Sequence, residues 1–163
     1  MKKGYLLILA ICCLAIAGCT KKVYQPATAT FQKSETTYLY DVGDGSITVR
    51  ASGMGANKAM ARLQARKQAV RDVIFKGVNV PNNVLLSKPL ITEVNAAQKY
   101  QYFFNSFFAD EGAWKQFVST QDNKPGVVVK SKEKSLNKKE YVIVRVAVPE
   151  LKNYLIDNGI AKP

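Results

Sequence analysis

The fold is decided by residues 46–77, which read SITVRASGMGANKAMARLQARKQAVRDVIFKG. The opening segment, Ser46–Ser52, alternates between apolar and polar side chains, a pattern that predicts a strand with one face in the core. After two closely spaced glycines, the apolar residues recur at the spacing of an amphipathic helix. The stretch therefore predicts a strand that leads directly into a helix. The core face of the strand holds Ile47, Val49 and Ala51, and the opposite face holds Thr48 and Arg50.

The helix is expected from Asn57 to Lys76, with Asn57 as its N-cap and Gly77 ending it. The segment Gly53-Met54-Gly55 before it is expected to form a tight turn in which glycine adopts a positive φ. A phosphate-binding loop is the alternative, but the remaining residues of the dinucleotide and P-loop motifs are missing. The predicted core stripe of the helix is Ala59, Leu63, Val70 and Ile74. Its basic residues form either a solvated face or a polyanion-facing surface: Lys58, Arg62, Arg66, Lys67, Arg71 and Lys76.

Outside this stretch, the pattern predicts further strands and two more helices. A strand at Thr36–Val42 reaches the first one through the turn sequence Gly43-Asp44-Gly45. The order of the elements predicts an α+β fold, an antiparallel sheet of about four to five strands packed on two main helices, with a short C-terminal helix. Residues 36–163 are expected to form this fold as a single domain. The other predicted elements are strands at Ala113–Thr120, Gly126–Lys134 and Glu140–Val148, and helices at Pro89–Phe108 and from Pro149 to Gly159.

The first 18 residues have the three zones of an export signal. Lys2 and Lys3 give a positive start, and an apolar run follows at Leu6–Ala17, with small residues before Cys19. The run is shorter than the roughly 20 residues that span a hydrocarbon core, so a cleaved signal is favoured over a membrane helix. The segment LAIAGC, which ends at Cys19, resembles the lipobox of bacterial lipoproteins. The resemblance implies that residues 1–18 are removed and that the Cys19 thiol carries a lipid anchor.

Residues 19–35 are expected to be the lipidated cysteine and a flexible tether, since the segment is polar and has no sustained period. No acidic residue follows the cysteine directly, because the next residues are Thr20-Lys21-Lys22. In lipoproteins this pattern goes with sorting to the outer membrane. The resemblance therefore implies a lipid-anchored protein of the outer membrane that faces the periplasm.

The composition excludes several kinds of chemistry. The chain contains no histidine, and Cys12 and Cys13 leave with the signal, so the mature domain has no thiol besides that of Cys19. His-based catalysis, ordinary zinc sites, disulfides and cysteine nucleophiles are thereby excluded. The adjacent Asp110 and Glu111 point in different directions on a helix or strand, which is poor geometry for paired acid–base work. We therefore expect a non-catalytic protein with no cofactor and no metal.

The net charge is strongly positive, +12 for the whole chain, and Lys2 and Lys3 account for the only charges lost with the signal. A basic surface attracts polyanions, and the export signal argues against nucleic acid as the partner. The densest cluster of positive charge is formed by five lysines. It could protect the edge of a strand, increase solubility, or contact lipopolysaccharide, anionic lipid or wall polymer. The candidate anion-binding residues are Lys130, Lys132, Lys134, Lys138 and Lys139.

An aromatic run at residues 100–108 has six aromatic side chains in nine residues, and Trp114 follows closely. Most of these rings share one arc of a helical wheel, which a core face could accommodate, whereas Tyr102 points elsewhere. The alternative is a surface for a partner subunit, since aromatic residues dominate interface anchors. The candidate partner-surface residues are Tyr100, Tyr102, Phe103, Phe104, Phe107 and Trp114.

The segment Ile47–Lys76 resembles a family of small outer-membrane lipoproteins that includes flagellar basal-disc lipoproteins. The resemblance rests on a strand running into Gly53-Met54-Gly55, followed by an alanine-rich helix. It implies that the alanines let the helix lie close to a small sheet, and that the protein assembles with partners in the envelope. The expected function is thus an accessory or assembly lipoprotein that binds another envelope protein or itself. An anion-binding module and a wall- or sugar-active enzyme are the alternatives. The alanines that carry the resemblance are Ala56, Ala59, Ala65 and Ala69.

Overall fold

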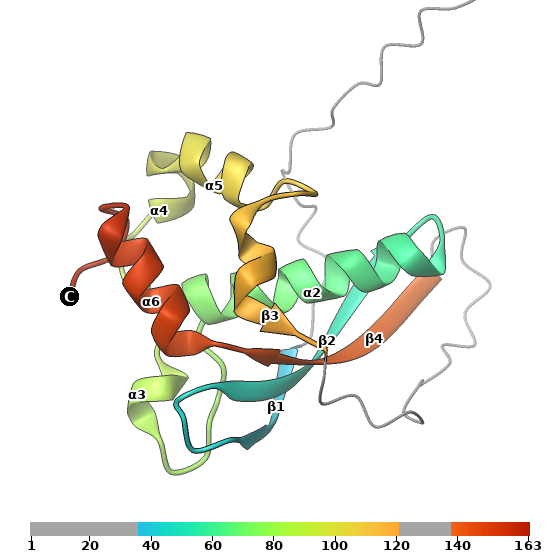
Figure 1. The fold of residues 1–163 in the computed structure, drawn as a ribbon, viewed down its shortest axis with the longest axis horizontal. Coiled ribbons are helices and arrows are strands. Elements are labelled where there is room, and N and C mark those ends of the chain that lie inside the picture. Colours follow the sequence, from blue (N-terminus) through green and yellow to red (C-terminus); the bar gives the residue numbers. More distant parts are fainter. Residues whose placement is uncertain (1–35, 121–137) are drawn as a thin grey trace, which may run out of the picture. The chain divides into compact units, whose positions relative to one another are not determined.

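The sheet has four strands, all antiparallel, in the order β1-β2-β4-β3 (Figure 1). The computed structural model describes residues 36–120 and 138–163, which belong to one compact unit. The expected signal, the tether with Cys19 and the predicted strand Gly126–Lys134 lie outside the described residues. The α+β architecture expected from the sequence is confirmed. The strands are β1 (Thr36–Asp41), β2 (Ile47–Gly55), β3 (Val118–Ser119) and β4 (Lys138–Val146).

The centre of the sheet is the long pairing of β2 with β4, which extends from Ile47 opposite Val146 to Gly55 opposite Lys138. The apolar alternation of both strands places their valines on one face, where Val49 and Val144 are fully buried. β1 joins β2 through the expected glycine turn. In that turn Gly43 and Gly45 both have φ of 85°, which is the left-handed region that glycine tolerates.

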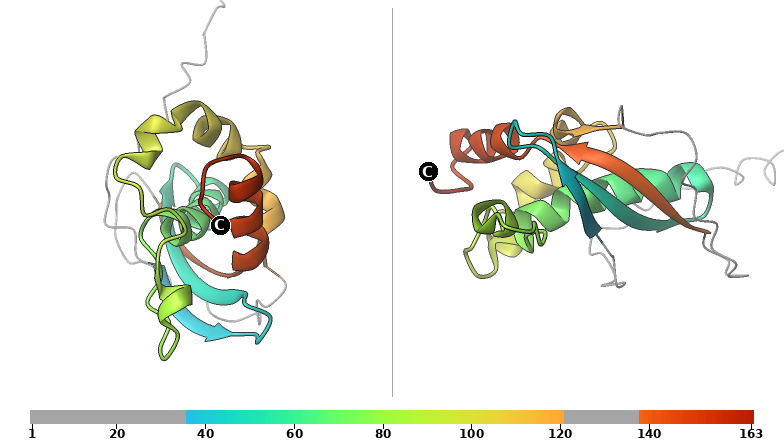
Figure 2. Two further views of the ribbon diagram at one scale, coloured as in Figure 1. Left: turned by 90° about the vertical axis from the view of Figure 1, so that its left-hand side faces the viewer. Right: turned by 90° about the horizontal axis from the view of Figure 1, so that it is seen from below.

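The long helix α2 (Lys58–Phe75) runs along the face of the sheet that carries these valines (Figure 2). Its N-cap is Asn57 as expected, whose side chain accepts a hydrogen bond from the backbone N–H of Met60 at 2.9 Å. The predicted core stripe is only half right. Val70 and Ile74 are buried, whereas Ala59 is exposed and Leu63 is partly buried. The face that rests on the sheet is instead made by three fully buried alanines, Ala61, Ala65 and Ala69.

The expected tight turn at Gly53-Met54-Gly55 is wrong, because both glycines belong to β2 and neither has a positive φ. Their role is close packing. A Cβ atom on Gly53 would overlap the backbone of Ala61 and Ala65, and one on Gly55 would overlap the backbone of Ala61. Glycine is needed here because α2 lies almost directly on the strand.

The predicted helix Pro89–Phe108 is much shorter than expected and is broken into α4 (Ala96–Lys99) and α5 (Gln101–Phe107). The first residues of the predicted helix pair with the end of α2 instead. The backbone N–H groups of Leu90 and Ile91 donate to the carbonyls of Val73 and Ile74 in the last turns of α2, at 3.2 and 3.0 Å. These bonds hold the chain in an extended path beside α2, so the helix begins only after Asn95, which has φ of 60°.

The predicted strand Ala113–Thr120 is also corrected. Ala113–Phe117 forms a 3-10 helix, η2, and only the two residues of β3 pair with β4. The indole N–H of Trp114 donates to the carbonyl of Ala109 at 2.8 Å, which holds this segment as a tight coil. The short C-terminal helix is confirmed as α6 (Val148–Asp157), with Pro149 in its first turn and Gly159 beyond its end.

Candidate functional site

The aromatic run contributes mainly to the core. The side chains of Phe104, Phe107 and Trp114 are 6%, 2% and 1% exposed, and the core interpretation therefore applies to them. Phe104 packs edge-on against Phe75 of α2 with ring centroids 4.9 Å apart. Tyr100 and Phe103 are partly buried at the border of the same cluster. Of the six residues proposed as a partner surface, these five lie in or against the core.

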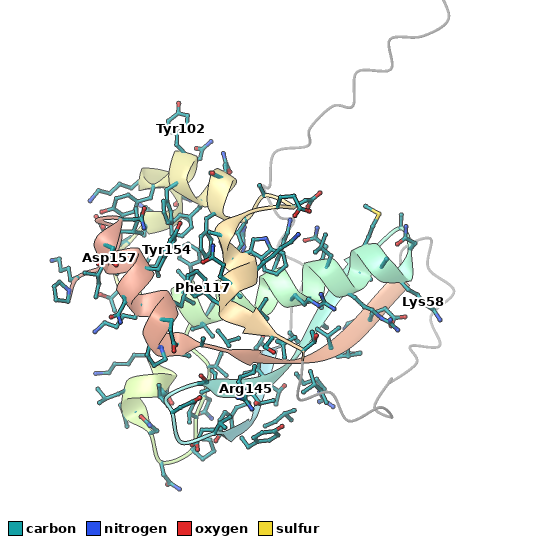
Figure 3. The ribbon with its side chains drawn as sticks, viewed as in Figure 1. Lys58, Tyr102, Phe117, Arg145, Tyr154 and Asp157 are labelled. Carbon is teal, nitrogen blue, oxygen red and sulfur yellow. The ribbon has the colours of Figure 1, made fainter. Side chains whose placement is uncertain are left out.

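Tyr102 is the exception, because its side chain is 91% exposed. Figure 3 shows it projecting from α5 away from the body of the domain, whereas Phe117 and Tyr154 lie between η2 and α6. The ring centroids of Phe117 and Tyr154 are 5.2 Å apart. The helical wheel had already separated Tyr102 from the other rings. A single exposed tyrosine does not make a surface, so the six residues together do not form a partner surface.

The five candidate anion-binding lysines are only partly described. Lys130, Lys132 and Lys134 lie outside the described residues, and for Lys138 only the backbone is described, paired with Gly55. Lys139 lies on β4 with its Nζ 5.3 Å from the centre of the Tyr141 ring. Arg50 of β2 approaches the same ring, with its Cζ at 5.8 Å from the ring centre.

Arg50, Lys139 and Tyr141 form what we call the basic sheet face. They alternate along β2 and β4 with the residues that face α2, and they therefore lie on the opposite side of the sheet. In the two described ranges, no carboxylate forms a salt bridge with Arg50 or Lys139. The alternation of apolar and polar residues in β2 correctly predicts that Arg50 lies on the face opposite the core. Tyr141 was missed because one tyrosine in a valine-rich strand carries no distinctive signal.

The basic residues of α2 are largely engaged within the domain. Lys67 donates to Asp110 at 2.8 Å, which lowers the pKa of that carboxyl below its usual value. Arg71 lies over the ring of Phe108, and burial lowers the pKa of its guanidinium. Arg62 forms a 3.5 Å ion pair with Glu140 of β4. These contacts are those expected of a basic face that packs its stems on neighbouring side chains, rather than of a free polyanion surface.

A second polar cluster ties β1 to α2 around Asp72, whose side chain is only 4% exposed. One carboxylate oxygen accepts from the hydroxyl of Thr36 at 2.6 Å, and the other accepts from the amide of Gln68 at 2.7 Å. The Nζ of Lys76 lies 3.2 Å from the second oxygen. Because all of these groups are satisfied by one another, the cluster has a structural role.

Exposed apolar side chains lie on β1 and directly after its last residue, Asp41. β1 is the terminal strand of the described sheet and pairs with β2 alone. Leu39, Tyr40 and Val42 are 39%, 46% and 41% exposed, and we call them the β1 rim. The ladder has an irregularity between Tyr38 and Tyr40, so Leu39 stands out of register. The hydroxyl of Tyr38 donates to Asp41 at 3.3 Å. Desolvation raises the pKa of the phenol, and the nearby negative charge of Asp41 raises it further.

A second exposed apolar feature lies between α2 and α4. The single-turn helix α3 (Val84–Ser87) places Val84 and Leu85 on the surface, where they are 69% and 81% exposed. Figures 1 and 2 show α3 and α5 at opposite sides of the described domain, so α3 and Tyr102 do not share a surface. Neither Val84 nor Leu85 was singled out from the sequence, because they resemble ordinary core residues of a helix.

The described residues contain neither a cluster of metal ligands nor a membrane-spanning helix. Within residues 36–120 and 138–163, no group of three or more histidine, cysteine or acidic side chains could hold a metal ion. Within the same ranges, no helix has the length and apolar character to cross a bilayer. Comparison of the chain with protein-family models, curated proteins and solved structures finds no match.

Proposed function

We propose that this chain is a lipid-anchored, non-catalytic accessory protein of the cell envelope, whose domain binds another envelope protein or a second copy of itself. The anchor is Cys19, and the address is the periplasmic side of the outer membrane. The export signal and the lipobox resemblance support this address. The composition supports the non-catalytic role, since no histidine occurs anywhere in the chain and His-based catalysis is thereby excluded.

The observation that carries the binding function is the β1 rim. Leu39, Tyr40 and Val42 are all more than a third exposed; Leu39 and Tyr40 are adjacent in the terminal strand, and Val42 follows its last residue, Asp41. Single exposed apolar residues are normal on a protein surface, but a contiguous set at a sheet edge is typical of an interaction site. The strand β1, Thr36–Asp41, contains neither lysine nor proline. These two residues are common devices that keep an edge strand from pairing with another chain.

The rim is suited to a protein rather than to a charged polymer. Its two aliphatic residues and one tyrosine offer apolar contact area and one hydroxyl, and removal of apolar surface from water contributes about 25 cal/mol per Å² before the costs of association. Tyrosine is also enriched among the residues that dominate binding energy at interfaces. We therefore expect binding at the rim to persist at high salt.

Site-specific photo-crosslinking in cells tests this function. A photo-reactive amino acid replaces Tyr40 or Val42 in the full chain, and Lys152 of α6 serves as the exposed control position. We expect an adduct of higher mass from positions 40 and 42 but not from position 152. Equal adducts from all three positions, or none from the rim, would contradict the proposal.

The address is tested separately with the full chain. The wild type is expected in the outer-membrane fraction, carrying acyl chains on Cys19 that mass spectrometry can detect. The Cys19→Ala variant cannot be acylated and is expected to lose this modification. A wild-type chain recovered with an unmodified thiol at Cys19 would overturn the anchor without bearing on the rim.

A second candidate function, binding of an anionic envelope component, is favoured by the basic sheet face. Arg50 and Lys139 flank one aromatic ring at 5.8 and 5.3 Å and have no carboxylate partner among the described residues. Cations held against a tyrosine are pre-positioned for a phosphate or carboxylate. Lys130, Lys132, Lys134 and Lys138 remain candidates for the same function.

This second function predicts binding that weakens as salt is added, because exposed charges are screened within about 10 Å at 0.1 M salt. The assay is sedimentation of the protein with vesicles containing phosphatidylglycerol. The variant Arg50→Gln/Lys139→Gln should bind less, whereas Lys152→Gln/Lys162→Gln, which also removes two positive charges from exposed positions, should bind nearly as wild type. Equal losses of binding in both variants would show that binding depends only on net charge, and would contradict a specific site at the basic sheet face.

A further inference from the structure

The loop between α2 and α4 ends in a small apolar tip. Val84 and Leu85 are adjacent in the sequence and open α3, with exposed fractions of 69% and 81%. The third apolar residue of this turn, Leu86, is partly buried and packs against the core. Val84 and Leu85 are thus adjacent exposed aliphatic side chains, whereas most aliphatic residues of the described domain are buried; Val94, near the end of the same loop, is exposed as well.

The tip is held outward by hydrogen bonds at its base. The side chain of Asn83 caps α3 by accepting from the backbone N–H of Leu86 at 3.1 Å. The hydroxyl oxygen of Ser87 accepts from the backbone N–H of Val80 at 2.8 Å, and this hydroxyl lies 2.8 Å from the carbonyl of Asn83, to which it donates. These bonds close the loop on itself and fix its shape. Val84 and Leu85 therefore cannot fold back onto the domain without breaking them.

The base of the loop is fixed as well. Gly77 adopts φ of 74°, and a side chain there would overlap the carbonyl of Ser87. The returning chain is joined to the end of α2 by the bond from Ile91 to Ile74. The tip is therefore a rigid projection.

The charge of the loop favours one kind of surface. Residues 77–92 contain no aspartate or glutamate, and Lys88 is their single charged residue. Glu93, near the end of the loop, is neutralised by Lys99, whose Nζ lies 2.6 Å from its carboxylate. Two exposed aliphatic residues with a lysine just behind them match the boundary of an anionic bilayer. There the aliphatic groups enter the acyl region and the ammonium remains among the headgroups. A protein partner would gain no particular advantage from the absence of acidic residues.

We propose that Val84 and Leu85 insert into the surface of the bilayer to which the chain is anchored, and thereby set the orientation of the domain. This inference rests on the proposed lipid anchor. The anchor keeps the domain close to the bilayer, since the 16 residues 20–35 can span at most about 55 Å. Insertion of two aliphatic side chains is too weak to hold a free protein firmly but is sufficient to orient a tethered one.

The test uses the mature, full-length lipoprotein in phosphatidylglycerol-containing vesicles, with a single environment-sensitive fluorophore. Because Cys19 is the only cysteine of the mature chain and is expected to be acylated, Leu85→Cys introduces the single reactive thiol. Tyr102→Cys is the matched control, since that residue is 91% exposed and projects from α5, on the opposite side of the domain from α3 (Figures 1 and 3). The fluorophore at position 85 should shift to the blue in vesicles and be quenched by lipids that carry a nitroxide. The fluorophore at position 102 should do neither.

The outcomes separate the two proposals. If the wild-type chain itself takes up the thiol label, the anchor has failed, and the two cysteine variants are no longer singly labelled. If the wild type stays unlabelled but positions 85 and 102 give the same aqueous emission and no quenching, the anchor holds and the insertion of the tip is overturned. A blue shift at position 85 that occurs without vesicles would indicate a protein contact instead and would also overturn the proposal. The variant Leu85→Asp, labelled at Val84→Cys, should lower the quenching at this site about tenfold, given the cost of burying a charge in place of a leucine.

Discussion

Gly53 of β2 lies so close to the backbone of Ala65 of α2 that a methyl group on the glycine would overlap the helix. Ala65 is fully buried in this contact, as are Ala61 and Ala69 one turn to either side. The small residues on both elements bring α2 closer to β2 than larger side chains would allow. The distance between helix and sheet in this domain is therefore set by residues that contribute little apolar area of their own.

Substitution of Gly53 by alanine is expected to destabilise the domain by about 3 kcal/mol or more, since the overlap is with the helix backbone, which cannot rotate away. Chemical denaturation of the purified domain measures this loss. Gly43→Asn is the control. Gly43 also has a special role, at φ of 85°, but nothing lies near its missing Cβ. Asparagine tolerates the left-handed region, so this variant should lose less than about 1 kcal/mol. Equal losses would show that the two glycines act only through their backbone freedom.

Asp72 joins the first strand to the long helix, and its removal should release β1. The variant Asp72→Ala leaves Gln68 and Lys76 without their acceptor and removes the 2.6 Å bond from Thr36. We expect a loss of about 2–3 kcal/mol in the free energy of unfolding, because hydrogen bonds to a buried charged group are among the stronger ones. Thr36→Val removes one of these bonds and should cost about 1 kcal/mol. The expectation fails if Asp72→Ala and Thr36→Val lose the same amount, or if hydrogen exchange in β1 is unchanged.

The strand β1, the first part of β2, the strand β4 and the ends of the long helix were predictable, because alternation and capping are local properties of the chain. Ile47, Val49 and Asn57 adopt the roles that their neighbours in the sequence predict. The face of α2 was not predictable in the same way. Alanine is compatible with either burial or exposure, so the stripe through Ala59 and Leu63 looked as good as the one through Ala61 and Ala65. The choice depends on the two glycines of β2, which only the packed structure brings under the helix.

The remaining errors share a physical cause, since tertiary contacts replaced local preference. Leu90 and Ile91 bond to the end of α2 and delay the next helix, and Trp114 bonds to Ala109 and coils a segment whose apolar run favoured a strand. The aromatic run was open between core and partner surface, and burial places all of its rings except that of Tyr102 in or against the core. The exposed pair Val84 and Leu85 could not have been recognised, because nothing in the sequence distinguishes an aliphatic residue held outward from one held inward. The basic sheet face was visible only as the polar side of β2, at Arg50.

The ion pair between Lys67 and Asp110 makes a small contribution to stability that depends on pH. The hydrogen bond from Lys67 lowers the pKa of Asp110 in the folded protein below its usual value of 3.8. The contribution is therefore fully present above pH 3.8 and is lost as the pH falls through the lower pKa of the folded state. Thermal unfolding of wild type and Asp110→Asn from pH 7 to pH 2 measures it.

The two melting temperatures should differ at pH 6–7 and converge as the pH falls below the usual carboxyl pKa. The carboxylate is largely exposed, so the difference in free energy at neutral pH should stay below about 1 kcal/mol. A control in which Lys67→Gln is added to Asp110→Asn should show no further pH-dependent loss. A difference that grows toward acid pH would contradict the assigned sign.

The division of the aromatic run between core and surface is open to direct measurement through Phe107 and Tyr102. Phe107 is 2% exposed and stacks on Phe103 with a centroid distance of 5.7 Å, while it meets Phe108 edge-on at 4.9 Å. Truncation to alanine would leave a cavity in the cluster between α5 and α6, so Phe107→Ala should cost about 3–5 kcal/mol. Tyr102→Ala removes a ring that is 91% exposed and should change the free energy of unfolding by less than about 0.5 kcal/mol. A Phe107→Ala variant that unfolds like the wild type but loses a crosslinked partner would contradict the core placement of this ring. It would instead support the partner surface that the sequence offered as the alternative for the aromatic run.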